Sequence, residues 1–109
     1  MTTIYVLLDD NQIKFIGKTQ KTNLNDKLAQ HQLEATTNPD KFGWISNLFN
    51  QGKSPEIKPI VSYHENEAER YEKVFLSDLK FFLGMTLTNT EAVKMKSLFK
   101  DSIEAKNLN

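Results

Sequence analysis

The chain has 109 residues, of which 39% are apolar, and its fourteen basic and fourteen acidic side chains give a formal net charge of zero. This length predicts a single domain over residues 1–109, with enough chain to form a core without disulfides. There is no cysteine, which excludes disulfides, thiolate zinc sites and cysteine nucleophiles. No apolar run is long enough to cross a bilayer, and the N-terminus lacks the pattern of a secretory signal. We therefore expect a cytoplasmic protein with no membrane partner.

The first elements along the chain are two short β-rich runs, residues 4–8 and 13–17. Aspartate and asparagine in the four residues between them favour a turn, so these runs predict an antiparallel hairpin. A helix follows, with Thr22 or Asn23 as its N-cap. Its apolar positions predict one buried face, formed by Leu24, Leu28 and Ala35.

Proline and glycine mark the middle of the chain. Asn38 followed by Pro39 predicts the start of a second helix, and Gly52 is expected to end it. A third strand is expected over residues 56–63. The second helix carries a dense apolar set, Phe42, Trp44, Ile45, Leu48 and Phe49.

Two further helices are expected after the third strand. Asn66 is the expected cap of the first, and Gly84 its expected stop. Thr88 and Glu91 have the spacing of a capping box ahead of a last helix over about residues 90–105. The third helix shows a regular apolar stripe, Ala68, Tyr71, Phe75, Leu79 and Phe82.

The expected order is therefore β-β-α-α-β-α-α. It predicts a small α/β domain in which a three-stranded central sheet, the N-terminal hairpin plus a third strand, is flanked by helices.

Glu72 falls within the apolar stripe of the third helix, between Ala68 and Phe75. A buried carboxylate without a partner is costly. Two interpretations follow. Glu72 lies at the edge of the stripe and reaches solvent, paired with Lys73 or Lys80, or it is a metal ligand or catalytic carboxylate.

Two further features have two interpretations each. Lys27 and His31 are four residues apart and share a helix face, where a histidine is either a satisfied structural group or a catalyst. Tyr5 has apolar strand neighbours and is either a packing residue or a functional phenol.

The order of these segments resembles the GIY-YIG nuclease family. IYVLL, FIGKT, a helix containing KLAQH, WISNL and the glutamate of EAERYE follow one another as the family's motifs do. NLFNQGKSPEIKPI is similar to the family's helix–turn–strand segment, and LGMTLTN to its closing segment. The resemblance covers about residues 3–90.

This resemblance implies a metal-dependent endonuclease that hydrolyses phosphodiester bonds in DNA, or in RNA, at one active site with one Mg²⁺ or Mn²⁺ ion. It makes Tyr5 the general base, with Lys18 as the cation that lowers the pKa of the phenol or contacts a phosphate. Glu72 becomes the metal ligand. Lys27 contacts the phosphate, and His31 orients the phosphate or Tyr5.

The resemblance also assigns Phe15, Gly17 and Asn89 to substrate binding. Three positions depart from the family pattern: Phe15 replaces the tyrosine of the second motif, Lys27 replaces an arginine, and, as a smaller change, Thr3 stands where the first motif usually has glycine. Lysine keeps the charge but lacks the bidentate fork of arginine. The alternative function is therefore a catalytically degenerate binding protein that acts on nucleic acid or inhibits a partner protein.

The charges are unevenly distributed despite their balance. Residues 11–33 hold four lysines against Asp26, whereas residues 65–72 hold four glutamates against Arg70. A weak basic patch of this kind predicts modest affinity for nucleic acid, most of all DNA, with low sequence specificity and a shallow salt dependence. A protein partner or a homodimer is left open.

Overall fold

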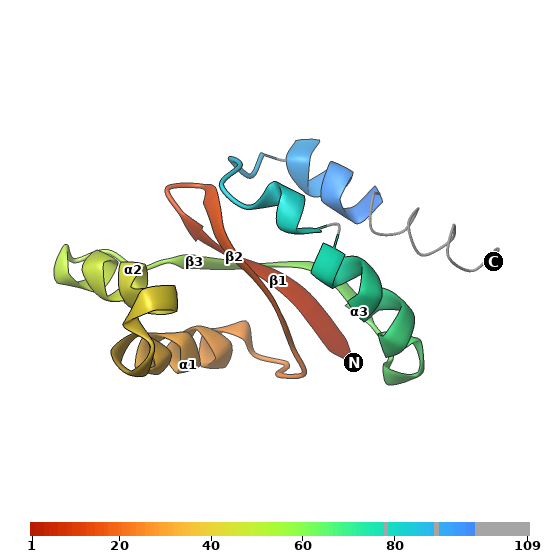
Figure 1. Cartoon of the computed structure of the whole chain (residues 1–109), viewed down its shortest axis with the longest axis horizontal. Helices are drawn as coiled ribbons and strands as arrows, with labels where there is room; N and C mark the ends of the chain where they lie inside the picture. Colours follow the sequence, from red (N-terminus) through yellow and green to blue (C-terminus); the bar gives the residue numbers. More distant parts are fainter. Residues whose placement is uncertain (78, 89, 98–109) are drawn as a thin grey trace.

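The structure is a computed structural model that describes residues 1–77, 79–88 and 90–97, without the side chains of residues 73–77. A three-stranded antiparallel sheet in the order β2-β1-β3 lies between two layers of helices. Figure 1 shows α1 and α2 on one face of this sheet, with α3 and the C-terminal helical segment on the other. The expected three-stranded α/β domain is thus confirmed.

The N-terminal hairpin joins β1 (Thr2–Asp9) to β2 (Gln12–Thr19). Both residues of its turn are left-handed, with φ of 52° at Asp10 and 64° at Asn11. Two-residue hairpin turns favour this conformation because its twist matches that of the strands, and aspartate and asparagine tolerate it. The predicted hairpin is confirmed, with strands longer than the apolar runs alone indicated.

β1 is the central strand and is buried on both faces. Its side chains alternate between two clusters, as the pleat of a strand requires. Ile4, Val6 and Leu8 pack with Leu79, Phe82 and Met95 on the α3 side. Tyr5 and Leu7 pack with Ala35, Phe42 and Ile45 on the side of α1 and α2. The core therefore has two halves separated by the sheet.

Helix α1 (Leu24–Thr37) begins as the sequence predicts. The side chain of its N-cap, Asn23, accepts a hydrogen bond of 3.0 Å from the backbone N–H of Asn25. Helix α2 (Pro39–Asn50) has Pro39 in its first turn. Shortly after its end, Gly52 takes a φ of 74°, a conformation that glycine adopts without strain.

Strand β3 (Glu56–Tyr63) pairs with β1 and forms one edge of the sheet. Its position matches the prediction. Pro59 lies opposite Tyr5 on this strand, which is possible because proline is tolerated in an edge strand.

The third predicted helix differs from the expectation in two ways. A 3₁₀ turn, η1 (Glu65–Glu67), precedes α3 (Ala68–Ser77), and a second one, η2 (Leu79–Phe82), follows it. The prediction that Asn66 is the N-cap is wrong, since Asn66 lies inside η1, where the backbone N–H of Glu67 already bonds to the carbonyl of His64 at 2.9 Å.

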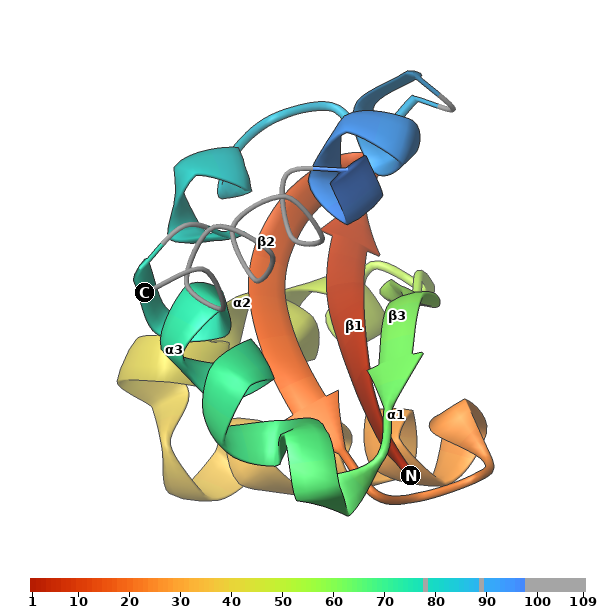
Figure 2. The same cartoon turned by 90° about the vertical axis from the view of Figure 1, so that its right-hand side faces the viewer.

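Gly84, with a φ of 87°, follows η2. The prediction that it ends the third helix is wrong, since α3 ends at Ser77. The next residues run beside β2 near the hairpin turn: Ile13 N–H donates to the Met85 carbonyl at 2.8 Å, and Leu87 N–H to the Asn11 carbonyl at 2.6 Å. Figure 2 shows this segment passing the end of the hairpin. The edge of β2 is therefore partly covered.

The last described helical segment covers residues 90–97. The hydroxyl oxygen of Thr88 accepts a hydrogen bond of 3.1 Å from the N–H of Glu91, as the capping prediction requires. The rest of that predicted helix lies outside the described residues.

Candidate functional site

A hydrogen bond between Tyr5 and His31 forms the centre of the first candidate group. The Tyr5 hydroxyl lies 2.5 Å from Nε2 of His31, and only 1% of Tyr5 and 3% of His31 are exposed. Tyr5 comes from the central strand and His31 from the buried face of α1. The two residues that the sequence placed 26 positions apart are thus brought into direct contact.

Aromatic rings enclose this pair. The ring centroids of Phe15 and Phe42 lie 5.1 and 5.0 Å from that of His31. The ammonium group of Lys41 lies over both phenylalanine rings, at 5.2 and 5.4 Å from their centroids. Phe15 is therefore part of the packing around His31, and Phe42 and Lys41 are neighbours of the site that sequence reasoning did not identify.

Gly17 makes room for the Tyr5 side chain. The two residues are register partners in neighbouring strands. A Cβ atom at position 17 would lie 2.6 Å from the Tyr5 hydroxyl oxygen and 2.7 Å from the ring of Phe15. Glycine is thus required at this position by the close approach of the phenol.

His31 is a neutral hydrogen-bond partner at pH 7. Burial lowers its pKa from the usual 6.5, and the positive charge of Lys27 acts in the same direction, whereas the carboxylate of Glu34 opposes both. Nδ1 of His31 lies 3.4 Å from Oε2 of Glu34. A proton on Nδ1 faces that carboxylate favourably, which leaves Nε2 to accept from the Tyr5 hydroxyl. Glu34 is one helical turn from His31, the spacing that could have identified it.

The pKa of Tyr5 is raised above its usual value, by burial first and by the negative charge of Glu34 second. A phenol acts as a base at pH 7 only when its pKa is lowered. The cation expected to lower it, Lys18, lies elsewhere. The local chemistry therefore favours a neutral Tyr5.

Lys18 and Glu72 form the second candidate group. Nζ of Lys18 lies 2.7 Å from Oε1 of Glu72, with 44% and 38% of these side chains exposed. They line a small cleft of about 190 Å³ together with Thr2, Thr19 and Gln20. Of the two interpretations of Glu72, its exposure agrees with a place at the edge of the apolar stripe, but its partner is Lys18. Of the two predicted partners, Lys73 has a side chain outside the described residues, and Lys80 makes no ion pair with Glu72 in the described part of the chain.

A second tyrosine lies on the Glu72 side. Tyr63 ends β3, opposite Thr2, and only 2% of it is exposed. Burial, and then the negative charge of Glu72, raise the pKa of its phenol. Its ring stacks on that of Tyr71 at a centroid distance of 4.6 Å. Nothing in the sequence singles out Tyr63 beyond its place at the end of a predicted strand.

The two groups occupy opposite faces of the sheet. Tyr5 pairs with Gly17, and Ile4 pairs with Lys18. Because register partners share a face and successive residues alternate, Lys18 points to the α3 side, where Ile4 is buried, and Tyr5 points to α1. The structure thus joins Tyr5, His31, Phe15 and Gly17 in one group and Lys18 with Glu72 in another.

The remaining predicted residues are peripheral or undescribed. Lys27 lies one turn before His31 on α1, where its ammonium donates to the Gln30 side chain at 3.3 Å. Asn89, the predicted closing asparagine, lies outside the described residues.

Metal-binding side chains are sparse. Among residues 1–77, 79–88 and 90–97 no group of three histidine, aspartate or glutamate side chains is arranged to hold a metal ion. Among the described residues the cleft offers one carboxylate, Glu72, which is paired with Lys18. A single carboxylate, completed by phosphate oxygens and waters, is a ligand set that Mg²⁺ accepts. It does not fit a structural zinc site.

Comparison with known proteins adds no assignment. No protein-family model matches the chain, and no curated protein or solved structure matches it either. In the part of the chain that the structure describes, none of the helices has the length and apolar character needed to span a bilayer.

We expect acid to destabilise the protein through His31. Its folded pKa is lowered, so below about pH 6.5 the unfolded chain takes up a proton that the folded chain does not. The free energy of unfolding should therefore fall as the pH falls below this value, by at most about 1.4 kcal/mol per pH unit. Urea unfolding measured from pH 7.5 down to pH 5 tests this.

Substituting each of the chain's two histidines shows whether His31 is the group responsible. His31→Gln should flatten this pH dependence, whereas His64→Gln, at an exposed position, should keep it. An unchanged slope in His31→Gln would show that another group is responsible.

Proposed function

We propose that this protein is a metal-dependent endonuclease of the GIY-YIG type, and that its reacting groups are Glu72 and Lys18. The observation that carries this proposal is the 2.7 Å contact between the Glu72 carboxylate and the Lys18 ammonium, two residues that line a small cleft. The carboxylate is the expected metal ligand, and the lysine is the expected phosphate contact. The order of strands and helices agrees with the motif resemblance.

The residues of this cleft have separate roles in the proposed reaction. Glu72 would hold one Mg²⁺ or Mn²⁺ ion. When bound, such an ion supplies a water of lowered pKa and positive charge beside the phosphate. Lys18, whose Nζ lies 2.7 Å from Oε1 of Glu72, would contact a phosphate oxygen. Thr2 also lines this cleft. It lies two residues before Ile4 on β1 and thus on the same face as Lys18, so its hydroxyl is a further hydrogen-bonding group for the substrate.

Tyr5 has a supporting role in this proposal. It is buried, bonded to His31, and on the opposite face of the sheet from Glu72. Its hydroxyl fixes His31 and thereby the packing of α1 on the sheet, rather than activating a water molecule.

The burial of Tyr5 also favours the second candidate function, a catalytically degenerate binding protein. Phe15, which stands in place of the second-motif tyrosine, has no hydroxyl, and the pKa of the Tyr5 phenol is raised. Neither residue on the α1 side therefore supplies the phenolic base that the resemblance implies. Such a protein would bind nucleic acid through Lys18 without cleaving it.

One experiment separates the two functions. Pure protein is incubated with supercoiled plasmid DNA, single-stranded DNA and RNA, each with Mg²⁺, Mn²⁺ or EDTA. The endonuclease proposal expects nicking of at least one substrate that depends on the divalent ion. Binding without cleavage in every metal condition would support the degenerate protein. Absence of both binding and cleavage would contradict both candidates.

A further inference from the structure

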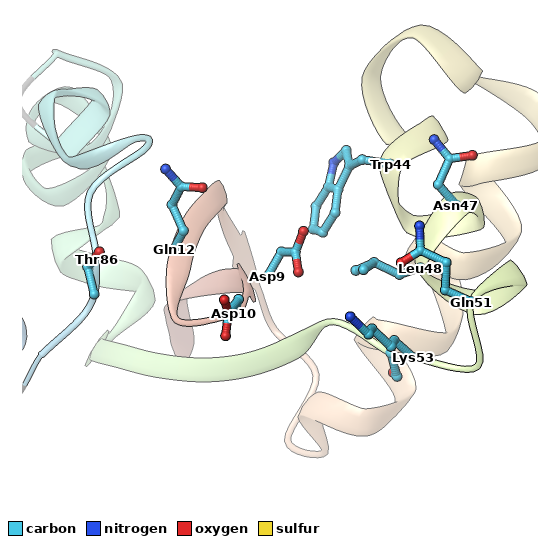
Figure 3. A pocket seen from close by; sticks show the side chains of 10 residues that line it. Asp9, Asp10, Gln12, Trp44, Asn47, Leu48, Gln51, Lys53 and Thr86 are labelled. Carbon is cyan, nitrogen blue, oxygen red and sulfur yellow. The ribbon is translucent and has the colours of Figure 1, made fainter.

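A second, larger cleft lies at the other end of the sheet, between the hairpin turn and α2 (Figure 3). Its volume is about 1030 Å³. Asp9 and Asp10 form one side, and α2 with Lys53 forms the other. Asp9 is seven residues along β1 from Thr2, so the two clefts are separated by roughly 24 Å of strand. This cleft is therefore distinct from the Lys18–Glu72 group.

One face of α2 forms the wall of this cleft. Trp44, Asn47, Leu48 and Gln51 line it, and their spacing of three, four and seven residues places them on the same side of the helix. The indole of Trp44 packs against the core cluster that contains Tyr5 and Phe42. It is thus held in place while its ring lines the cleft (Figure 3).

Charged groups without partners complete the site. In the described part of the chain, Asp9, Asp10 and Lys53 make no side-chain hydrogen bond and no ion pair. Figure 3 shows the Asp9 carboxylate between the hairpin and the Trp44 indole. Two carboxylates against one ammonium leave the cleft with a net negative charge.

We propose that this cleft binds an arginine side chain of a partner polypeptide. A planar guanidinium stacks on an indole and donates two parallel hydrogen bonds to a carboxylate. The cleft offers the indole of Trp44 and the carboxylate of Asp9 next to each other, and the amide oxygens of Asn47 and Gln51 are further acceptors. A phosphate backbone is disfavoured by the two carboxylates. This inference does not rest on the proposed nuclease activity.

The chain's single tryptophan provides a direct readout. The full-length protein is titrated with N-acetyl-arginine amide while Trp44 fluorescence is recorded, and N-acetyl-citrulline amide serves as the neutral isostere. We expect a saturable change with the arginine compound in the millimolar range and none with the citrulline compound. Equal responses to both, or no saturable response to arginine, would overturn the proposal.

Substitutions give opposite signs that simple misfolding would not produce. Asp9→Asn should weaken arginine binding about tenfold, because a charge-assisted hydrogen bond is lost. Lys53→Gln should strengthen it several-fold, because a like charge is removed. Asp26→Asn, an exposed aspartate in the first turn of α1, should leave it unchanged. If a single-stranded oligonucleotide saturates the Trp44 signal and Asp9→Asn tightens that binding, the cleft takes a nucleobase and the proposal fails.

Discussion

Glu72→Gln is expected to lower metal-dependent cleavage by at least about 100-fold. Among the described residues Glu72 is the one carboxylate that lines its cleft, and metal-ion catalysis contributes several kcal/mol to such reactions. The same substitution weakens the 2.7 Å contact with Lys18, because it removes a negative charge from the cleft. Binding to nucleic acid should therefore be kept or strengthened. Cleavage assays with Mn²⁺ and filter binding in EDTA measure the two effects separately.

The matched control is Glu56→Gln. Glu56 also pairs with a lysine, Lys58, at 3.4 Å, but this pair lies on the exposed edge of β3 and is not part of the cleft. Glu56→Gln should cleave like the unaltered protein. Equal losses in both variants would mean that the effect comes from net charge. Full activity in Glu72→Gln would place the reaction at another site and contradict the role of Glu72.

Tyr5→Phe separates two roles for Tyr5: the general base that the motif resemblance implies, and a buried hydrogen-bond partner of His31. A general base on Tyr5 predicts complete loss of cleavage. A buried partner of His31 predicts a different result. Tyr5→Phe should lower the free energy of unfolding by about 1–3 kcal/mol, because Nε2 of His31 loses its hydrogen-bond partner. Cleavage per folded molecule should then be retained. Urea denaturation and cleavage rates at a temperature where the variant is fully folded decide between them.

Local features of the chain could be predicted well. The hairpin turn at Asp10 and Asn11, the start of α2 at Pro39 and the cap at Thr88 each depend on the conformational preferences of one or two residues. Such preferences act without help from distant parts of the chain. The 3₁₀ turns on both sides of α3 were missed because the apolar stripe continues through them with helical spacing.

Which residues share a site could be predicted only in part, because this depends on the pairing register between β1 and β2. Gly17 and Lys18 are neighbours in the FIGKT segment, and this suggested one common site with Tyr5. In a strand, neighbours point to opposite faces, and the pairing of Ile4 with Lys18 assigns the lysine to the α3 side. The cleft around Trp44 was beyond sequence reasoning for a similar reason, since it combines Asp9, Trp44 and Thr86 from distant segments.

Gly17→Ala is expected to destabilise the protein by about 1–3 kcal/mol, the usual cost of adding a methyl group to a filled interior. The new Cβ would lie 2.6 Å from the hydroxyl oxygen of Tyr5 and 2.7 Å from the ring of Phe15. Tyr5 has little freedom to retreat, because it is buried and bonded to His31. For a domain of this size each kcal/mol lowers the melting temperature by about 4–8 °C.

Gly43→Ala is the matched control, with the opposite expected sign. Gly43 lies inside α2, and the nearest atom to an added Cβ is Cβ of Pro39 at 3.9 Å, an ordinary contact. Alanine in a helix interior is favoured over glycine by about 0.5–1 kcal/mol, so this variant should melt at a higher temperature than the unaltered protein. Urea midpoints at an unchanged m-value measure both variants. If Gly17→Ala is as stable as Gly43→Ala, the phenol of Tyr5 does not lie over residue 17, and the Tyr5–His31 group described above is not formed in solution.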